Sequence, residues 1–116
     1  LHGLTPSLAS LQDQGYKIGL VTDGRMSGAS GKVPNAIHLT PESLNQGAIT
    51  KIRDGDIIEL DLENGILRVL IDEDTFAKRK PLEIDLSHNE YGFGRELFAN
   101  FRINVTTSET GATAAF

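Results

Sequence analysis

Tyr16-Lys17-Ile18-Gly19-Leu20-Val21-Thr22 runs directly into Asp23-Gly24-Arg25-Met26-Ser27-Gly28-Ala29-Ser30-Gly31-Lys32, and these two stretches decide the fold. The first is largely apolar and predicts a strand that is covered on both faces. The second holds three glycines and is followed by Pro34, so it predicts a loop with unusual backbone angles. A loop that follows a buried strand lies at the carboxyl end of a sheet, where α/β proteins bind ligands.

Both helices and strands are predicted on either side of this loop. Periodic leucines and a closing Gly15 predict a helix over 4–14, with Thr5 as its N-cap. Asn64-Gly65 is a strong hairpin signal, and Asp72 to Asp74 place acids at the start of a helix that Pro81 ends. The remaining expected elements are strands over 36–40, 57–62 and 66–71 and helices over 75–80 and 94–103. Together they predict an α/β fold, a swivelling β/β/α domain with a mixed, barrel-like sheet flanked by short helices.

Composition narrows the class of protein. The chain has 116 residues, a net charge of −5 and no cysteine, so it suits one domain and holds no disulfide, iron–sulfur cluster or thiolate zinc by itself. Residues 51–90 carry eleven acids against six bases, which accounts for the whole excess of negative charge. No basic stripe predicts nucleic-acid binding, and no apolar run is long enough to span a membrane. Without a leader pattern, a cytoplasmic protein is expected.

The glycine-rich loop carries the groups that hold an anion. Backbone amides of such a loop converge on negative charge, Arg25 offers a bidentate fork, and Lys32 offers a point charge. Ser27 and Ser30 add hydroxyls that suit a polyhydroxylated ligand. A plain glycine-rich surface connection remains an alternative. The spacing matches neither a P-loop nor a nucleophile elbow, since the glycines are too close and the serine is misplaced.

Other polar residues receive structural interpretations at this point. The three histidines are too scattered for a zinc site, and His38 is expected in a strand beside the loop. Glu42 is interpreted as a turn or helix-start carboxylate, and Asp54 and Asp56 as solvated residues around a turn glycine. Phe98 and Phe101 are expected in a core or an interface.

Three parts of the chain match a known pattern: the segment from Val21 to Pro34, the segment Ala36-Ile37-His38-Leu39-Thr40-Pro41-Glu42, and the turn Asp54-Gly55-Asp56. In these parts the chain resembles the dihydroxy-acid/phosphogluconate dehydratase family. Members carry a T-D-G-R-[FM]-S-G loop, an H-[VL]-[ST]-P-E segment and a D-G-D turn, in this order. The resemblance covers almost the whole chain. Met26, the continuation from Ala29 to Pro34 and Arg95-Glu96-Leu97-Phe98 resemble the phosphogluconate branch of the family more than the dihydroxy-acid branch.

This resemblance implies a hydro-lyase that converts 6-phosphogluconate to 2-dehydro-3-deoxy-6-phosphogluconate and water in the Entner–Doudoroff pathway. Residues 1–116 would form its C-terminal domain, while a larger N-terminal domain, absent from this chain, would hold a 4Fe-4S cluster, with Mg²⁺ as a further candidate cofactor. Ser27 would be the catalytic base, dependent on that metal centre, and the whole enzyme would be a homodimer. The resemblance places the substrate against Asp23, Gly24, Arg25, Gly28, Ser30, Lys32 and His38, with no metal ligand in this chain.

Two alternatives stay open on the sequence alone. One is a dehydratase of dihydroxy-acids or of another sugar acid. The other is a free-standing small swivelling domain without catalysis that binds anions or partner proteins.

Overall fold

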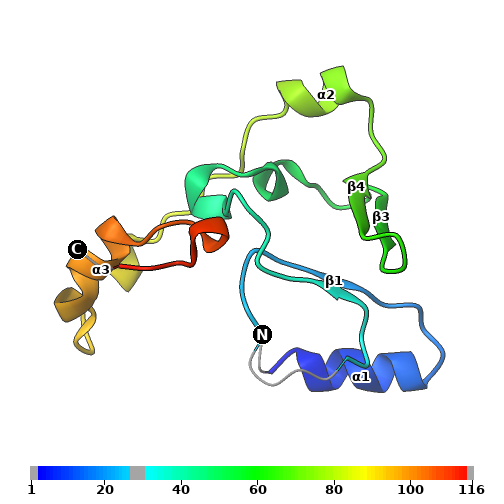
Figure 1. Cartoon of the computed structure of the whole chain (residues 1–116), viewed down its shortest axis with the longest axis horizontal. Coiled ribbons are helices and arrows are strands. Elements are labelled where there is room, and N and C mark those ends of the chain that lie inside the picture. Colours follow the sequence, from blue (N-terminus) through cyan, green and yellow to red (C-terminus); the bar gives the residue numbers. More distant parts are fainter. Residues whose placement is uncertain (1–2, 27–30, 115–116) are drawn as a thin grey trace.

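The computed structural model describes residues 3–26 and 31–114 of the chain. It contains both short helices and small sheets, which confirms a mixed α/β class (Figure 1). The helices and strands are α1 (Thr5–Asp13), β1 (Leu20–Val21), β2 (Asn35–Ala36), β3 (Ile58–Asp61), β4 (Ile66–Val69), α2 (Glu73–Lys78) and α3 (Ala99–Asn104). Short 3₁₀ helices cover Ser43–Asn45, Ala48–Lys51, Ser87–Asn89, Arg95–Phe98 and Ser108–Thr110. In this described part no helix is long and apolar enough to cross a membrane.

The strands form two separate pairs. β1 lies parallel to β2, and β3 lies antiparallel to β4. Residues 3–26 and 31–114 therefore contain two small sheets, one of each kind, and no closed barrel, so the barrel-like sheet is absent there.

Both strands beside the glycine loop are shorter than predicted. The amides of Leu20 and Thr22 donate to the carbonyls of Pro34 and Ala36 at 2.9 and 3.0 Å, but residues 16–19 are outside the ladder. On the partner strand the ladder ends at Ala36, two residues before His38, whose φ of 56° is left-handed and incompatible with an extended strand. The prediction that 16–22 is covered on both faces is also wrong: Tyr16, Lys17 and Gly19 are exposed, and Leu20 and Val21 are half-buried. An apolar pattern contains no information about whether a partner strand or a covering layer is available.

The hairpin is confirmed. The connection from β3 to β4 runs over residues 62–65 and ends in Asn64-Gly65, where Gly65 takes a positive φ of 66°. Glu59 lies opposite Arg68 in the ladder, and the two side chains form an ion pair. The cross-strand register therefore matches opposite charges on the exposed face.

The two outer helices follow their sequence signals, with one correction. α1 begins at Thr5 itself, and its N-cap Leu4 makes no side-chain cap, so the prediction of Thr5 as the cap is wrong. α2 is capped as the acids predicted: the carboxylate of Asp72 accepts the amide of Thr75 at 2.9 Å. The final helix is divided, since a 3₁₀ turn over Arg95–Phe98 precedes α3.

Asp56 corrects another expectation, because it is not solvated. Its side chain is 7% exposed and receives both guanidinium nitrogens of Arg79, at 2.5 and 2.9 Å. The amide of Arg53 donates to the same carboxylate at 2.8 Å. These donors, Arg79 first, hold the pKa of Asp56 below its usual range. The bidentate pair fastens the end of α2 to the turn before β3, across 23 positions of sequence.

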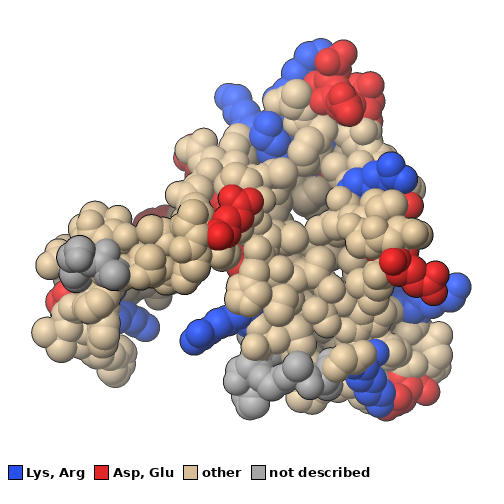
Figure 2. Space-filling model, in the orientation of Figure 1, with Lys and Arg blue, Asp and Glu red and all other residues tan. Residues whose placement is uncertain are grey.

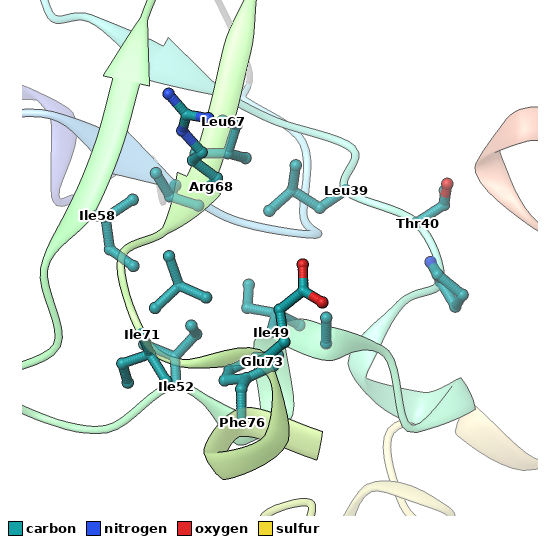
Figure 3. Close-up of a pocket in the computed structure, with 14 residues that line it drawn as sticks. Leu39, Thr40, Ile49, Ile52, Ile58, Leu67, Arg68, Ile71, Glu73 and Phe76 are labelled. Carbon is teal, nitrogen blue, oxygen red and sulfur yellow. The ribbon is translucent and has the colours of Figure 1, made fainter.

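Little of the described chain is fully buried. Val33 is the single large side chain there with less than 2% exposure. Between the hairpin, α2 and the segment from Leu39 to Ile52 lies an apolar hollow of about 550 Å³. Figure 3 shows Leu39, Ile49, Ile58, Leu67 and Ile71 pointing into this hollow from different elements. These elements therefore surround apolar space that their own side chains do not fill.

Residues 82–105, called the apolar arm below, extend away from the two sheets (Figure 1). Their large apolar side chains are exposed: Leu82, Ile84, Leu86, Tyr91, Phe93, Leu97, Phe98, Phe101, Ile103 and Val105. The rings of Phe98 and Phe101 lie 6.1 Å apart, yet the two residues remain 57% and 49% exposed. Figure 2 shows mostly uncharged surface over this arm. Exposed apolar surface of this extent is typical of an interaction surface.

Candidate functional site

The first end of the glycine loop is fastened by Asp23. One oxygen of its carboxylate, Oδ2, accepts the backbone amide of Ser43 at 2.7 Å and also the hydroxyl of Ser43. The Ser43 hydroxyl and then its amide lower the pKa of Asp23, so this carboxylate is ionised at neutral pH. The predicted site residue Asp23 thus bonds the loop to the 3₁₀ helix Ser43–Asn45.

Gly24 and His38, also predicted site residues, lie next to each other. The amide of His38 donates to the carbonyl of Gly24 at 3.1 Å, and the amide of Gly24 donates to the hydroxyl of Thr22 at 3.0 Å. The left-handed backbone of His38 turns the chain at this point, and the residue is exposed. His38 therefore stands at the loop, although at a bend and not within a strand as predicted.

The far end of the loop is fastened to α1. The ammonium of Lys32 lies 2.6 Å from the carboxylate of Asp13, and the side-chain amide of Gln12 donates to the carbonyl of Lys32 at 2.6 Å. Lys32 and Asp13 side chains are 46% and 61% exposed, so the ion pair is a weak one in water. An anion of higher charge could take the ammonium from Asp13 at small cost.

Arg25 is the exposed cation between these two anchors. Within the described ranges, no ion pair or hydrogen bond engages its guanidinium. Its fork is therefore available to a carboxylate or phosphate group. The predicted residues Ser27, Gly28 and Ser30 lie outside the described residues.

Glu42 has contacts that the sequence interpretation missed. Its Oε1 accepts the amide and the hydroxyl of Ser108, at 2.8 and 2.9 Å, across 66 positions of sequence. The Ser108 amide, Glu42's own amide and the Ser108 hydroxyl lower the pKa of Glu42 to about 2. The hydroxyl of Thr40 donates to Glu109 at 2.7 Å beside this contact. Nothing in the local pattern around Ser108 signals its partner, since the two segments meet only in the fold.

The described residues hold no group of three or more histidines, aspartates and glutamates arranged to bind a metal ion. The apolar hollow is a poor place for a charged, hydroxylated ligand, because its lining offers few polar partners to replace water. The glycine loop is therefore the candidate site. It is anchored at both ends, by Ser43 and by α1, with the cation Arg25 between the anchors and the cation Lys32 at the second one.

A family model described as "Dihydroxy-acid/6-phosphogluconate dehydratase C-terminal" matches residues 2–112. The chain belongs to this family. The expectation drawn from the loop, the H-L-T-P-E segment and the D-G-D turn is thereby confirmed.

Individual members of the family differ in how much of the chain they match. A phosphogluconate dehydratase of Helicobacter pylori (strain ATCC 700392 / 26695) is 57% identical over 96% of this chain, and one of Escherichia coli (strain K12) is 52% identical over 97%. A dihydroxy-acid dehydratase of Methanobrevibacter smithii is 40% identical over 65%. The chain spans about a fifth of the length of the two phosphogluconate dehydratases, 19% in each case.

Proposed function

We propose that this chain is the C-terminal, swivelling domain of a hydro-lyase that converts 6-phosphogluconate to 2-dehydro-3-deoxy-6-phosphogluconate and water. The observation that carries the proposal is the likeness to phosphogluconate dehydratases along nearly the whole chain, glycine loop included. A phosphorylated sugar acid does not cross membranes unaided, so the proposed enzyme acts in the cytoplasm.

The reaction assigns distinct tasks to the loop. The proton on C2, next to the carboxylate, must leave together with the hydroxyl on C3, which gives an enol that becomes the 2-keto product. We assign the C2 proton to the Oγ of Ser27, acting as base in its deprotonated form. Arg25 and Lys32 hold the substrate's carboxylate and phosphate, while Gly24 and Gly28 let the backbone approach. Asp23 and Ser30, which belong to the loop, and His38, which follows it, complete the polar contacts.

The iron–sulfur cluster expected for this family does not fit the residues of this chain. The sequence has no cysteine, and the described residues offer no alternative group of ligands. We therefore assign the 4Fe-4S cluster, and any Mg²⁺, to the larger N-terminal part of the enzyme. In this proposal the N-terminal part, and not the glycine loop, assists the departure of the C3 hydroxyl.

The exposed surface of the apolar arm favours the presence of a large partner domain in the same enzyme. Ten of its apolar residues are between 39% and 101% exposed, and the chain accounts for 19% of the length of its relatives. We propose that the remaining part of the enzyme covers this arm and lies against the glycine loop, so that the two parts together form the substrate site. Removing such surface from water contributes about 25 cal/mol for each Å², before the costs of association and ordering are subtracted.

A labelling experiment tests the proposed reaction. The longer protein, incubated anaerobically in D₂O with 6-phosphogluconate, should give the keto-deoxy product with one deuterium at C3, detected by NMR. The deuterium is expected because the enol intermediate takes its new C3 proton from solvent. An oxidised product, or no product from protein with its full iron content, would refute the proposal.

Arg25 provides a second test. Arg25→Ala in the longer protein should lower kcat/KM for 6-phosphogluconate, because a charge-assisted contact with the substrate is lost. The ratio of the two kcat/KM values should correspond to a loss of about 1.5–3 kcal/mol in transition-state stabilisation. Arg25→Lys is the matched control, since it keeps the charge and removes the fork. An Arg25→Ala enzyme with normal KM and kcat would remove this residue from the site.

A further inference from the structure

The C-terminal segment 106–113 forms a closed turn that bonds to itself. The amide of Thr106 donates to the carbonyl of Thr113 at 2.9 Å, and the amide of Ala112 donates to the carbonyl of Thr107 at 3.0 Å. Gly111 closes the turn with a φ of 94°. This segment therefore has a defined shape of its own, although its small polar residues carry no strong helix or strand pattern.

The turn is held against the segment that follows the glycine loop. Figure 1 shows the red turn around Ser108–Thr110 beside the teal 3₁₀ helices. Ser108 donates its amide and hydroxyl to Glu42, and Thr40 donates its hydroxyl to Glu109. Because each side both donates and accepts, the two segments are fixed in register as well as in contact.

The same segment holds the loop on its other side. Ser43, the residue after Glu42, donates its amide and hydroxyl to Asp23. Asp23 directly precedes Gly24, whose carbonyl receives the amide of His38. Ser108 thus bonds to Glu42, and the next residue in the chain, Ser43, bonds to Asp23, two positions before Arg25.

We infer that Ser108 and Glu42 are positioning residues, through which the C-terminal turn fixes the start of the glycine loop for substrate binding. Neither residue needs to touch the substrate in this role. The low pKa of Glu42 agrees with it, because the carboxylate stays ionised and accepts both bonds at any physiological pH. The inference rests on the proposed function for its kinetic consequence, but its structural part stands independently.

The test uses the longer protein with three substitutions and a double-mutant cycle. Glu42→Ala should lower kcat/KM for 6-phosphogluconate about tenfold, mainly through a higher KM, and Ser108→Ala about threefold, since its amide remains. Ser108→Thr should restore the wild-type value. The kcat/KM of the double variant should be no lower than that of Glu42→Ala alone, because both substitutions remove the same contact between Ser108 and Glu42.

Thr110→Ala is the matched control, since Thr110 lies in the same turn and its hydroxyl bonds within the turn, to the carbonyl of Thr107. Its kcat/KM should equal that of the wild type. Fully additive effects of the two substitutions, or unchanged kcat/KM in both single variants, would overturn the inference.

Residue-resolved hydrogen exchange separates this inference from the proposed function. Exchange at the amides of Ser43 and His38, which bond to Asp23 and Gly24, should accelerate at least about fivefold in Glu42→Ala and not in Thr110→Ala. Should Glu42→Ala fail to fold, Ser108→Ala gives the same readout with a smaller change. If the wild type does not act on 6-phosphogluconate, faster exchange still supports the turn's role and unchanged exchange overturns it.

Discussion

Ser27→Ala in the longer protein should lower turnover of 6-phosphogluconate about 10²–10⁴-fold, the usual contribution of a general base. Under the proposed chemistry the Oγ of Ser27 takes the C2 proton, and alanine offers no group for this task. Substrate affinity, measured by calorimetry, should change little, since the cations that hold the substrate remain in place. Iron content should match the wild type.

A matched control for this substitution is Ser30→Ala, which removes a hydroxyl from the same loop without removing the proposed base. Its kcat should fall far less than that of Ser27→Ala. Wild-type turnover in Ser27→Ala would refute the assignment of the base. A loss of substrate binding equal to the loss of turnover would make Ser27 a binding residue.

Gly47→Ala should destabilise the domain by about 3 kcal/mol or more. A Cβ at this position would lie 1.6 Å from the carbonyl oxygen of Pro41 and 2.5 Å from its carbon, so the backbone has to move. The amide of Gly47 also donates to the backbone carbonyl of Glu42, and the carbonyl of Gly47 accepts the amide of Thr50. The displacement would therefore reach the residue that receives the C-terminal turn.

Gly31→Ala is the control for stability, because an added Cβ there has nothing within 4 Å. Thermal unfolding of the two variants in the longer protein should show a clearly lower transition for Gly47→Ala alone. Equal transitions would contradict the close approach of Gly47 to Pro41.

Local patterns in the sequence predicted the elements that local forces determine. Asn64-Gly65 located the hairpin because its turn geometry selects those two residues, and Asp72 located the start of α2 because a cap is a contact over three positions. The roles of the loop residues Asp23, Gly24, Arg25 and Lys32 stay predictions drawn from their order in the sequence, and the family model that matches the chain spans all four.

The missed features depend on contacts between distant segments. Asp56 was predicted to be solvated, but Arg79, 23 positions away, binds its carboxylate. Glu42 was predicted to be a simple turn or helix-start residue, but its carboxylate also accepts the amide of Ser108. The strand over 36–40 was predicted too long, because nothing in an apolar stretch signals the left-handed backbone of His38. Pairing partners are chosen by the whole fold, so a local pattern does not contain them.

The most direct measurement of the central claim is kcat/KM of the longer protein for three substrates, under anaerobic conditions: 6-phosphogluconate, unphosphorylated gluconate and dihydroxyisovalerate. A site whose cations hold both a carboxylate and a phosphate should prefer 6-phosphogluconate over gluconate by about tenfold or more, since a lost charge-assisted contact costs about 1.5–3 kcal/mol. Dihydroxyisovalerate should be the poorest of the three. Higher kcat/KM for dihydroxyisovalerate than for 6-phosphogluconate would contradict the account and place the chain in a dihydroxy-acid dehydratase.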